Sequence, residues 1–159
     1  ARAAVSYLAD HPVFYYDLTG WEHLEYIPRL HGTDDWEQQA VDLLDMGGLM
    51  DRVDDLPTTF SRGLKQKAAL TMAIVRPYDV MLNDEPFVGL DRLGKHALLD
   101  LLTLAHRDGA TLVVATHELS SVKESSRLIA LGNGELVYDG DPETADLASL
   151  TEGARPDPD

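Results

Sequence analysis

The chain lacks cysteine and has no long apolar run. Without cysteine it can form neither a disulfide framework nor a thiolate metal site, which fits a reducing compartment. Its longest apolar stretch, residues 97–105, is interrupted by Asp100 and is too short to cross a bilayer. Any role at a membrane would therefore need a partner chain.

Basic residues are also scarce. The 13 lysines and arginines stand against 28 aspartates and glutamates, which leaves a formal net charge of −15. A charge of this sign repels a phosphate backbone, so we expect no nucleic-acid partner. Acidic pairs such as residues 34–35 and 54–55 are typical of a solvated surface.

Several catalytic motifs are missing. There is no G-x-S-x-G serine elbow, and His117-Glu118 lacks the second histidine of the zinc motif H-E-x-x-H, because position 121 is serine. Residues 89–95 fit the first seven positions of the phosphate loop G-x-x-x-x-G-K-[ST], but His96 replaces the hydroxyl that binds magnesium. A true phosphate loop also follows its strand at once, which this stretch does not, so we do not interpret it as one.

The hydrophobic pattern of the first half predicts an opening strand at residues 5–8 and an all-helical block at residues 12–76. In the last helix of the block, Leu64, Ala68 and Met72 recur at helical spacing. The expected helices are residues 19–30, with Thr19 as N-cap; a helix that starts at Asp34-Asp35 and ends at Gly47-Gly48; and a helix that begins at Ser61 and is stopped by Pro77.

From residue 77 the pattern becomes strand-like. Residues 80–82 and 111–115 are apolar runs of the kind found in strands buried on both faces of a parallel sheet, and an apolar helical stripe at residues 98–105 lies between them. This predicts a β-α-β unit. We expect a short helix beyond His117, then a hairpin with an Asn-Gly turn at residues 133–134, and an acidic tail with one short helix.

Two places in this pattern carry chemistry. Asp84 and Glu85 follow a buried strand, where the carboxyl ends of parallel strands form a ligand crevice, and a bound cation would compensate two neighbouring carboxylates. Ser61 opens a helix whose free N–H groups and positive dipole end favour an anion. The alternatives are a solvated turn for the carboxylates and an ordinary capped helix for Ser61.

Taken in order, residues 61–66, 83–86, 89–91 and His117 resemble the second half of an ABC transporter ATPase, with its signature loop, Walker B strand, D-loop and switch histidine. Residues 18–25 and 61–67 resemble the ABC-2 exporter group. The first half, with the phosphate loop, is missing, so we expect a fragment. The implied fold is α/β: a partial P-loop NTPase core with a RecA-like parallel sheet at residues 1–11 and 77–140, a helical subdomain inserted at residues 12–76, and an acidic tail at residues 141–159.

The resemblance implies roles for the residues at the end of the buried strand. Asp84 would hold Mg²⁺, usually through water, and Glu85 would orient or deprotonate the water that attacks ATP. His117 would hydrogen-bond the γ-phosphate. Asp10 stands where the family has its Q-loop glutamine; a carboxylate there could approach Mg²⁺ but adds negative charge beside the other two acids.

The resemblance also implies that the site is completed by a second subunit. Ser61, Arg62 and Gly63 would contact the γ-phosphate of ATP bound on the opposite protomer. Asp91 would act across the dimer as the D-loop aspartate, or cap the helix that follows it, or both.

An ATP-hydrolysing subunit is the function this implies, with ATP and Mg²⁺ bound and a second ATPase subunit as partner. It would lie at the cytoplasmic face of the cell membrane, where its helical block would dock a cytoplasmic helix of a separate transmembrane permease. We expect the chain alone to be inactive, because the phosphate loop is missing. Two alternatives are a soluble ABC ATPase acting on ribosomes or DNA and a non-catalytic regulatory module.

Overall fold

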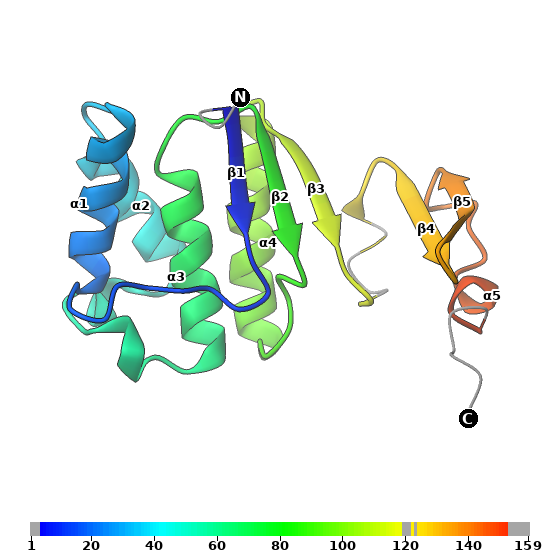
Figure 1. Cartoon of the computed structure of the whole chain (residues 1–159), viewed down its shortest axis with the longest axis horizontal. Helices are drawn as coiled ribbons and strands as arrows, with labels where there is room; N and C mark the ends of the chain where they lie inside the picture. Colours follow the sequence, from blue (N-terminus) through cyan, green and yellow to red (C-terminus); the bar gives the residue numbers. More distant parts are fainter. Residues whose placement is uncertain (1–3, 119–121, 123, 153–159) are drawn as a thin grey trace. The chain divides into compact units, whose positions relative to one another are not determined.

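The computed structural model describes residues 4–118, 122 and 124–152, and the chain divides into two compact units, Ala1–Thr116 and His117–Asp159. In the described residues, no helix has both the length and the hydrophobicity needed to cross a membrane. The elements labelled in Figure 1 are β1 (Val5–Leu8), α1 (Gly20–His31), α2 (Glu37–Gly47), α3 (Arg62–Ile74), β2 (Val80–Asp84), α4 (Arg92–Arg107), β3 (Thr111–Ala115), β4 (Leu128–Gly132), β5 (Glu135–Gly140) and α5 (Leu147–Glu152).

A parallel sheet of three strands, in the order β1-β2-β3, organises the first unit. Residues 5–8 of β1 pair with residues 80–83 of β2, and residues 80–84 of β2 pair with residues 111–115 of β3, without a break in either ladder. Helix α4 connects β2 to β3. The predicted opening strand, the β-α-β unit and the α/β class are therefore confirmed, whereas the division between a partial core and an inserted subdomain stays a prediction.

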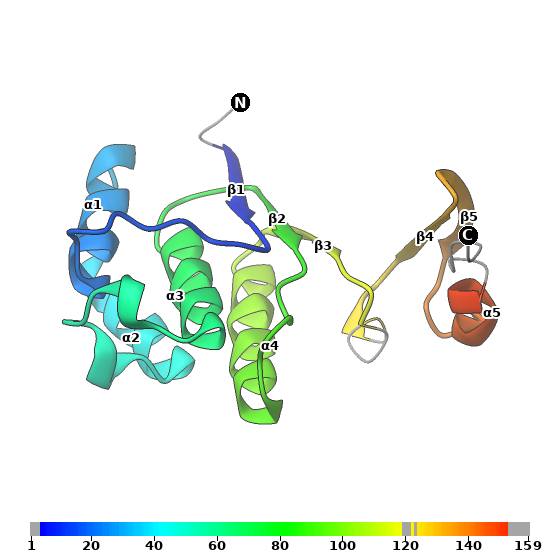
Figure 2. The same ribbon diagram turned by 60° about the horizontal axis from the view of Figure 1, so that its bottom comes forward.

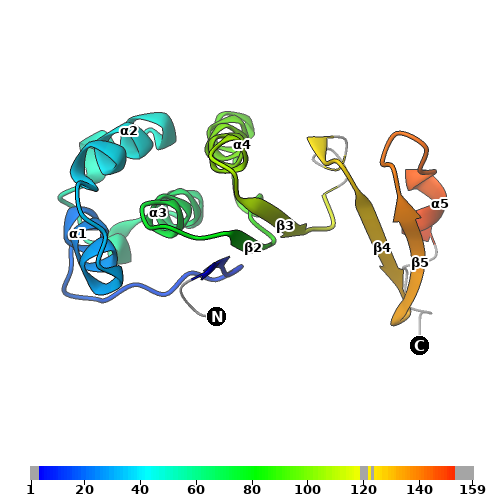
Figure 3. The ribbon, with the colours of Figure 1, turned by 90° about the horizontal axis from the view of Figure 1, so that it is seen from above.

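Helices cover one face of this sheet. Helix α3 packs against β1 and α4 against β3, and Figure 3 shows α4 lying along one side of the sheet. Met81 is completely buried on that side, whereas Leu82 and Val113, on the other side, are 39% and 51% exposed. The prediction that both strands are buried on both faces is therefore wrong for this chain. An unbroken apolar run contains no alternation that could distinguish the covered face from the open one.

The helical block begins with a capping box at α1. Thr19 Oγ1 accepts a hydrogen bond from the N–H of Glu22, and the Glu22 carboxylate accepts one from the N–H of Thr19. The helix ends at Gly32, which has the left-handed conformation expected of a C-cap. Thr19 is therefore the N-cap that the sequence predicts.

Helix α2 starts later than predicted. Asp35 has φ of +55°, which is incompatible with a right-handed helix, so the helix begins at Glu37. Trp36 is buried as the N-cap, and its ring centroid lies 5.5 Å from that of Trp21. Packing of this tryptophan pair, which local propensity does not register, decides where the helix starts. Its end at Gly47 and Gly48 matches the prediction.

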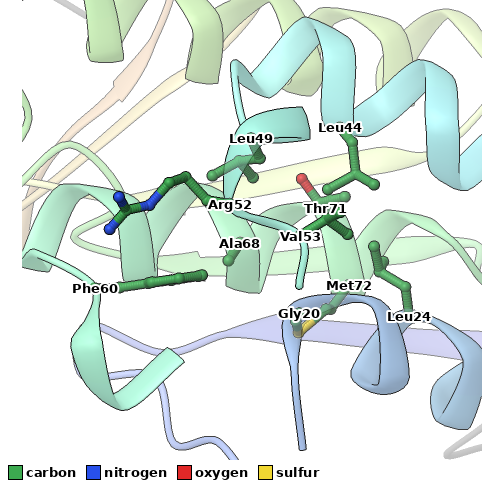
Figure 4. A pocket seen from close by; sticks show the side chains of 10 residues that line it. All are labelled: Gly20, Leu24, Leu44, Leu49, Arg52, Val53, Phe60, Ala68, Thr71 and Met72. Atoms are coloured by element: carbon green, nitrogen blue, oxygen red, sulfur yellow. The ribbon is translucent and has the colours of Figure 1, made fainter. Parts of the chain in front are cut away.

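Helix α3 begins after the N-cap Ser61, whose hydroxyl accepts from the N–H of Leu64 at 3.3 Å. It packs against α1 and α2, and Figure 2 shows the three helices as neighbours. Side chains from α1, α2 and α3 and the segment between α2 and α3 enclose a cavity of only about 10 Å³, seen in Figure 4. This volume is about that of one water molecule, so the cavity belongs to the core.

The second unit contains the hairpin β4–β5. The strands are antiparallel, and Asn133 and Gly134 connect them with φ of +51° and +81°, as a type I′ turn requires. Two hydrogen bonds join the Arg127 guanidinium to Asp139 and lower the pKa of that carboxyl. The hairpin and the short tail helix α5 are therefore confirmed. The helix expected beyond His117 lies mostly outside the described residues.

Candidate functional site

The candidate site lies where the parallel strands end. Because β1, β2 and β3 run in the same direction, their carboxyl ends share one edge of the sheet. Asp84 is the last residue of β2, Glu85 follows it, and Thr116 follows β3. The structure therefore places the two predicted carboxylates at the edge of the sheet where the parallel strands end.

Glu85 is held in an uncommon backbone conformation. Its φ is +46°, in the left-handed region, which costs a non-glycine residue about 1–3 kcal/mol and persists only where the surrounding structure enforces it. Its N–H donates to the carbonyl of Ala115 at 2.8 Å, and the hydroxyl of Thr116 donates to Glu85 Oε2 at 3.1 Å. The end of β3 and the residue that follows it thus fix both the backbone and the carboxylate of Glu85.

Gln66 connects helix α3 to Glu85, a contact that the sequence did not reveal. Its side chain is 1% exposed, and its Nε2 lies 3.5 Å from the carbonyl oxygen of Glu85, a long hydrogen bond. Its Oε1 is buried with no hydrogen-bond partner among the described residues. The signal was available, since Gln66 stands at the head of a second apolar stripe, four and eight residues before Leu70 and Ile74.

The carboxylates at the end of β2 have a donor set suited to Mg²⁺. Asp84 is half-buried, and Tyr7 Oη lies 3.5 Å from its Oδ2, at the outer limit of a hydrogen bond. Within the described residues there is no group of three or more side chains that could hold a metal by themselves. Mg²⁺ usually takes one or two carboxylates and completes its shell with water and substrate phosphates, which Asp84 with Glu85 would fit.

A larger cavity lies at the N-terminal end of α3. Its volume is about 480 Å³, and its walls come from the end of α2, the start of α3 and the segment leading into α4. Ser61 and Gly63, two of the predicted phosphate contacts, line it. A Cβ on Gly63 would lie 3.1 Å from the Leu90 side chain and 3.2 Å from the carbonyl of Gly89, so glycine allows this close approach.

Lys67 supplies a positive charge to the wall of this cavity, and the sequence did not single it out. Its Nζ donates to the carbonyl of Gly47 at 2.6 Å. Burial lowers the pKa of the ammonium group, and the nearby charge of Asp91 partly opposes that shift.

Asp91 caps helix α4. Its Oδ1 accepts from the N–H of Gly94 at 2.7 Å, which confirms the capping alternative and leaves its D-loop role a prediction. Residues 85–88 separate the end of β2 from residues 89–95, so this stretch does not follow its strand at once as a phosphate loop would.

Asp10 contacts the first residue of helix α3. Its Oδ1 accepts from Arg62 Nη2 at 2.8 Å, and its Oδ2 lies 2.8 Å from Nδ1 of His11. His117 is the first residue of the second unit and is exposed. Its predicted contact with the γ-phosphate stays a prediction, as do the roles of the other site residues toward ATP and Mg²⁺.

Paired carboxylates at the end of a parallel strand, joined to a capped helix beside a glycine-lined cavity, define an α/β protein suited to handling a phosphate ligand. The family described as ABC transporter matches residues 1–88, so the chain belongs to that family. Its members include ATP-binding subunits of transporters, and the family generally hydrolyses ATP with Mg²⁺.

Individual relatives agree with this membership. The uncharacterized ABC transporter ATP-binding protein YthP of Bacillus subtilis is 36% identical over 138 residues, which are 85% of this chain and 58% of YthP. The ABC-type transporter ATP-binding protein EcsA of the same organism is 33% identical, over 85% of this chain and 56% of EcsA. The chain thus spans less than two thirds of the length of these relatives.

A solved structure of the ATP binding subunit of an ABC transporter superposes with a TM-score of 0.85 at 29% identity, covering 95% of this chain and 68% of that one. The fold is therefore that of ABC ATPase subunits. A macrolide export ATP-binding/permease protein, MacB 2 of Yersinia pestis, is 35% identical over 77% of this chain and 18% of its own length.

Proposed function

We propose that this chain is part of an ATP-hydrolysing subunit that powers an ABC exporter through a separate membrane permease. The observation that carries the proposal is the fixed position of Glu85 beside Asp84. In-line phosphoryl transfer needs a positioned water and neutralised charge more than covalent chemistry. Glu85 would accept a proton from the attacking water, and Asp84 would hold the Mg²⁺ that the substrate brings.

The chain's own residues support this division of roles. Thr116 holds one carboxylate oxygen of Glu85 and Gln66 contacts its backbone carbonyl, so both the side chain and the backbone of Glu85 are positioned. Ser61 and Gly63 line a cavity beside the N-terminus of α3, where N–H groups favour the negative charge of a phosphate. We propose that this phosphate belongs to ATP bound on a second subunit.

The export direction and the membrane partner are the finer part of the proposal. The export direction follows the wording of residues 18–25 and 61–67 and the likeness to a macrolide exporter. The separate membrane partner follows the wording of residues 18–25 and 61–67 alone. We place the contact with the permease on the helical block, at the cytoplasmic face of the membrane. Val13, Tyr15 and Tyr16, just before α1, are exposed apolar side chains of the kind enriched in interfaces.

The test of the proposed function is Glu85→Gln in the full-length protein with its permease. We expect hydrolysis to be almost abolished while ATP-induced dimers persist, because the amide keeps the shape of the side chain but accepts no proton. Turnover is measured by phosphate release and dimers by light scattering. The matched control is Glu37→Gln, an exposed position at the start of α2, which should keep wild-type turnover. Unchanged turnover in Glu85→Gln would remove Glu85 from this role.

A further inference from the structure

Asp10 and Arg62 are two of the predicted site residues, and they contact each other. Asp10 replaces the Q-loop glutamine, and Arg62 lies within the signature loop. Although 52 positions separate them in the chain, Arg62 Nη2 donates to Asp10 Oδ1 at 2.8 Å. Asp10 thus supplies a carboxylate, and Arg62 supplies the cation that pairs with it.

Both oxygens of the Asp10 carboxylate face protein donors. Arg62 contacts Oδ1, and Nδ1 of His11 lies 2.8 Å from Oδ2. The Arg62 charge compensates a third acid in a part of the chain that already contains Asp84 and Glu85. The carboxylate is therefore oriented toward α3, and its charge is balanced without a metal ion.

Arg62 is in turn placed by the segment that leads into α4. Gly89 has φ of +81°, and a Cβ at that position would lie 2.8 Å from Cδ and 3.1 Å from Cγ of Arg62. The stem of Arg62 thus lies over Gly89 while its guanidinium reaches Asp10. This one side chain joins the loop after β1, the start of α3 and the loop before α4.

The contact between Asp10 and Arg62 contributes little to stability, so we consider its effect on the position of Arg62. The side chains of Arg62 and Asp10 are 48% and 31% exposed, and an ion pair this exposed typically contributes about 0–1 kcal/mol. Arg62 is, however, the first residue of α3 and lies between Ser61 and Gly63. A displacement of Arg62 would therefore also displace its neighbours Ser61 and Gly63, which belong to the lining of the cavity at the start of α3.

We propose that Asp10 is a positioning residue that acts on hydrolysis through Arg62, by holding the N-terminus of α3 in place, and that it is not a ligand of Mg²⁺. The proposal rests on the proposed function, since it assigns the start of α3 to the phosphate of ATP. A carboxylate that works through a partner must lose its effect when the partner is removed. A carboxylate that binds the metal directly must keep its effect on hydrolysis when Arg62 is removed.

The experiment is a double-mutant cycle in the full-length protein with its permease, using Asp10→Asn, Arg62→Met and the double variant. Methionine keeps an apolar stem over Gly89. We expect Asp10→Asn to lower kcat by roughly fivefold in the wild-type background and by less than about twofold beside Arg62→Met. The Mg²⁺ concentration for half-maximal rate should stay within about twofold of wild type in Asp10→Asn. The control is Asp55→Asn with Arg52→Met, a pair of 45% and 46% exposure that should leave kcat unchanged.

A second readout is independent of turnover. Hydrogen exchange of residues 61–66 should be faster in Asp10→Asn than in wild type, with exchange in α1 unchanged. Equal effects of Asp10→Asn in both backgrounds, a raised Mg²⁺ requirement, or unchanged exchange at residues 61–66 would each overturn the proposal. Wild-type turnover that does not depend on Glu85 would instead overturn the proposed function, and the exchange measurement would still decide whether Asp10 positions α3.

Discussion

Gln66 is the buried polar residue through which helix α3 reaches Glu85. We predict that Gln66→Met in the full-length protein lowers kcat by roughly fivefold with little change in KM, as expected for a lost hydrogen bond of about 1 kcal/mol. Stability should be retained, because the substitution also removes the unpaired Oε1.

Phosphate release and urea unfolding measure the two effects of Gln66→Met. Gln39→Met, at an exposed position of α2, is the control for introducing a methionine. An unchanged kcat in a stably folded Gln66→Met protein would show that Glu85 does not need this anchor.

Gly89 shows how a backbone position can depend on a neighbouring side chain. Gly89→Ala should lower the free energy of unfolding by more than the roughly 1–2 kcal/mol that positive φ alone costs alanine, because the new methyl group would displace Arg62. Gly109→Ala is the matched control, since Gly109 also has positive φ but nothing lies within 4 Å of its Cβ position. Urea denaturation measures both, and equal losses would mean that Arg62 moves aside without cost.

At the scale of the element, the capping box makes the stability of α1 depend on pH. The hydrogen bonds from Thr19 lower the pKa of Glu22 below its usual 4.5 in the folded state. Between the pKa of Glu22 in the folded state and its usual 4.5, the unfolded state therefore binds more protons than the folded state. The stabilisation is present above pH 4.5 and is lost as the pH falls through the pKa of Glu22 in the folded state.

We predict that Glu22→Gln is less stable than wild type at pH 7 and that the difference shrinks below pH 4.5. Urea unfolding followed by circular dichroism at several pH values measures it. Glu37→Gln is the control, because the N-cap of α2 makes no side-chain hydrogen bond there. A stability difference that does not change with pH would mean that the charge of Glu22 contributes nothing to the cap.

At the scale of the whole molecule, the proposed function requires two subunits that share their sites. We predict that Ser61→Arg in the full-length protein blocks ATP-driven dimerisation and turnover while leaving nucleotide binding to the monomer intact. Loss of the N-cap alone would cost about 1 kcal/mol of stability and leave catalysis per folded molecule largely unchanged.

The decisive measurement mixes Ser61→Arg subunits with subunits that carry a phosphate-loop lysine mutation, each inactive alone. In the mixed dimer both lesions fall on one composite site, and the other site is intact, so ATP should be trapped there. Equal trapping by the Ser61→Arg homodimer would rule out action across the dimer.

Local patterns explain why most elements could be predicted. Thr19 and Ser61 are N-caps, Gly47-Gly48 ends a helix, and Asn133-Gly134 forms a turn, because each depends on hydrogen bonds or φ angles within a few residues. The late start of α2 was missed because the burial of Trp36 against Trp21 is a contact between distant residues.

The candidate site divides in the same way. The sequence by itself determined that Asp84 and Glu85 stand at the end of a strand and that Ser61 opens a helix, since order and spacing along the chain carry that information. Only the tertiary structure decided that Thr116 and Gln66 hold Glu85, that Asp10 pairs with Arg62, and that one face of the sheet is open. These facts depend on which distant segments meet, and no local pattern records the partner of a side chain that lies fifty positions away.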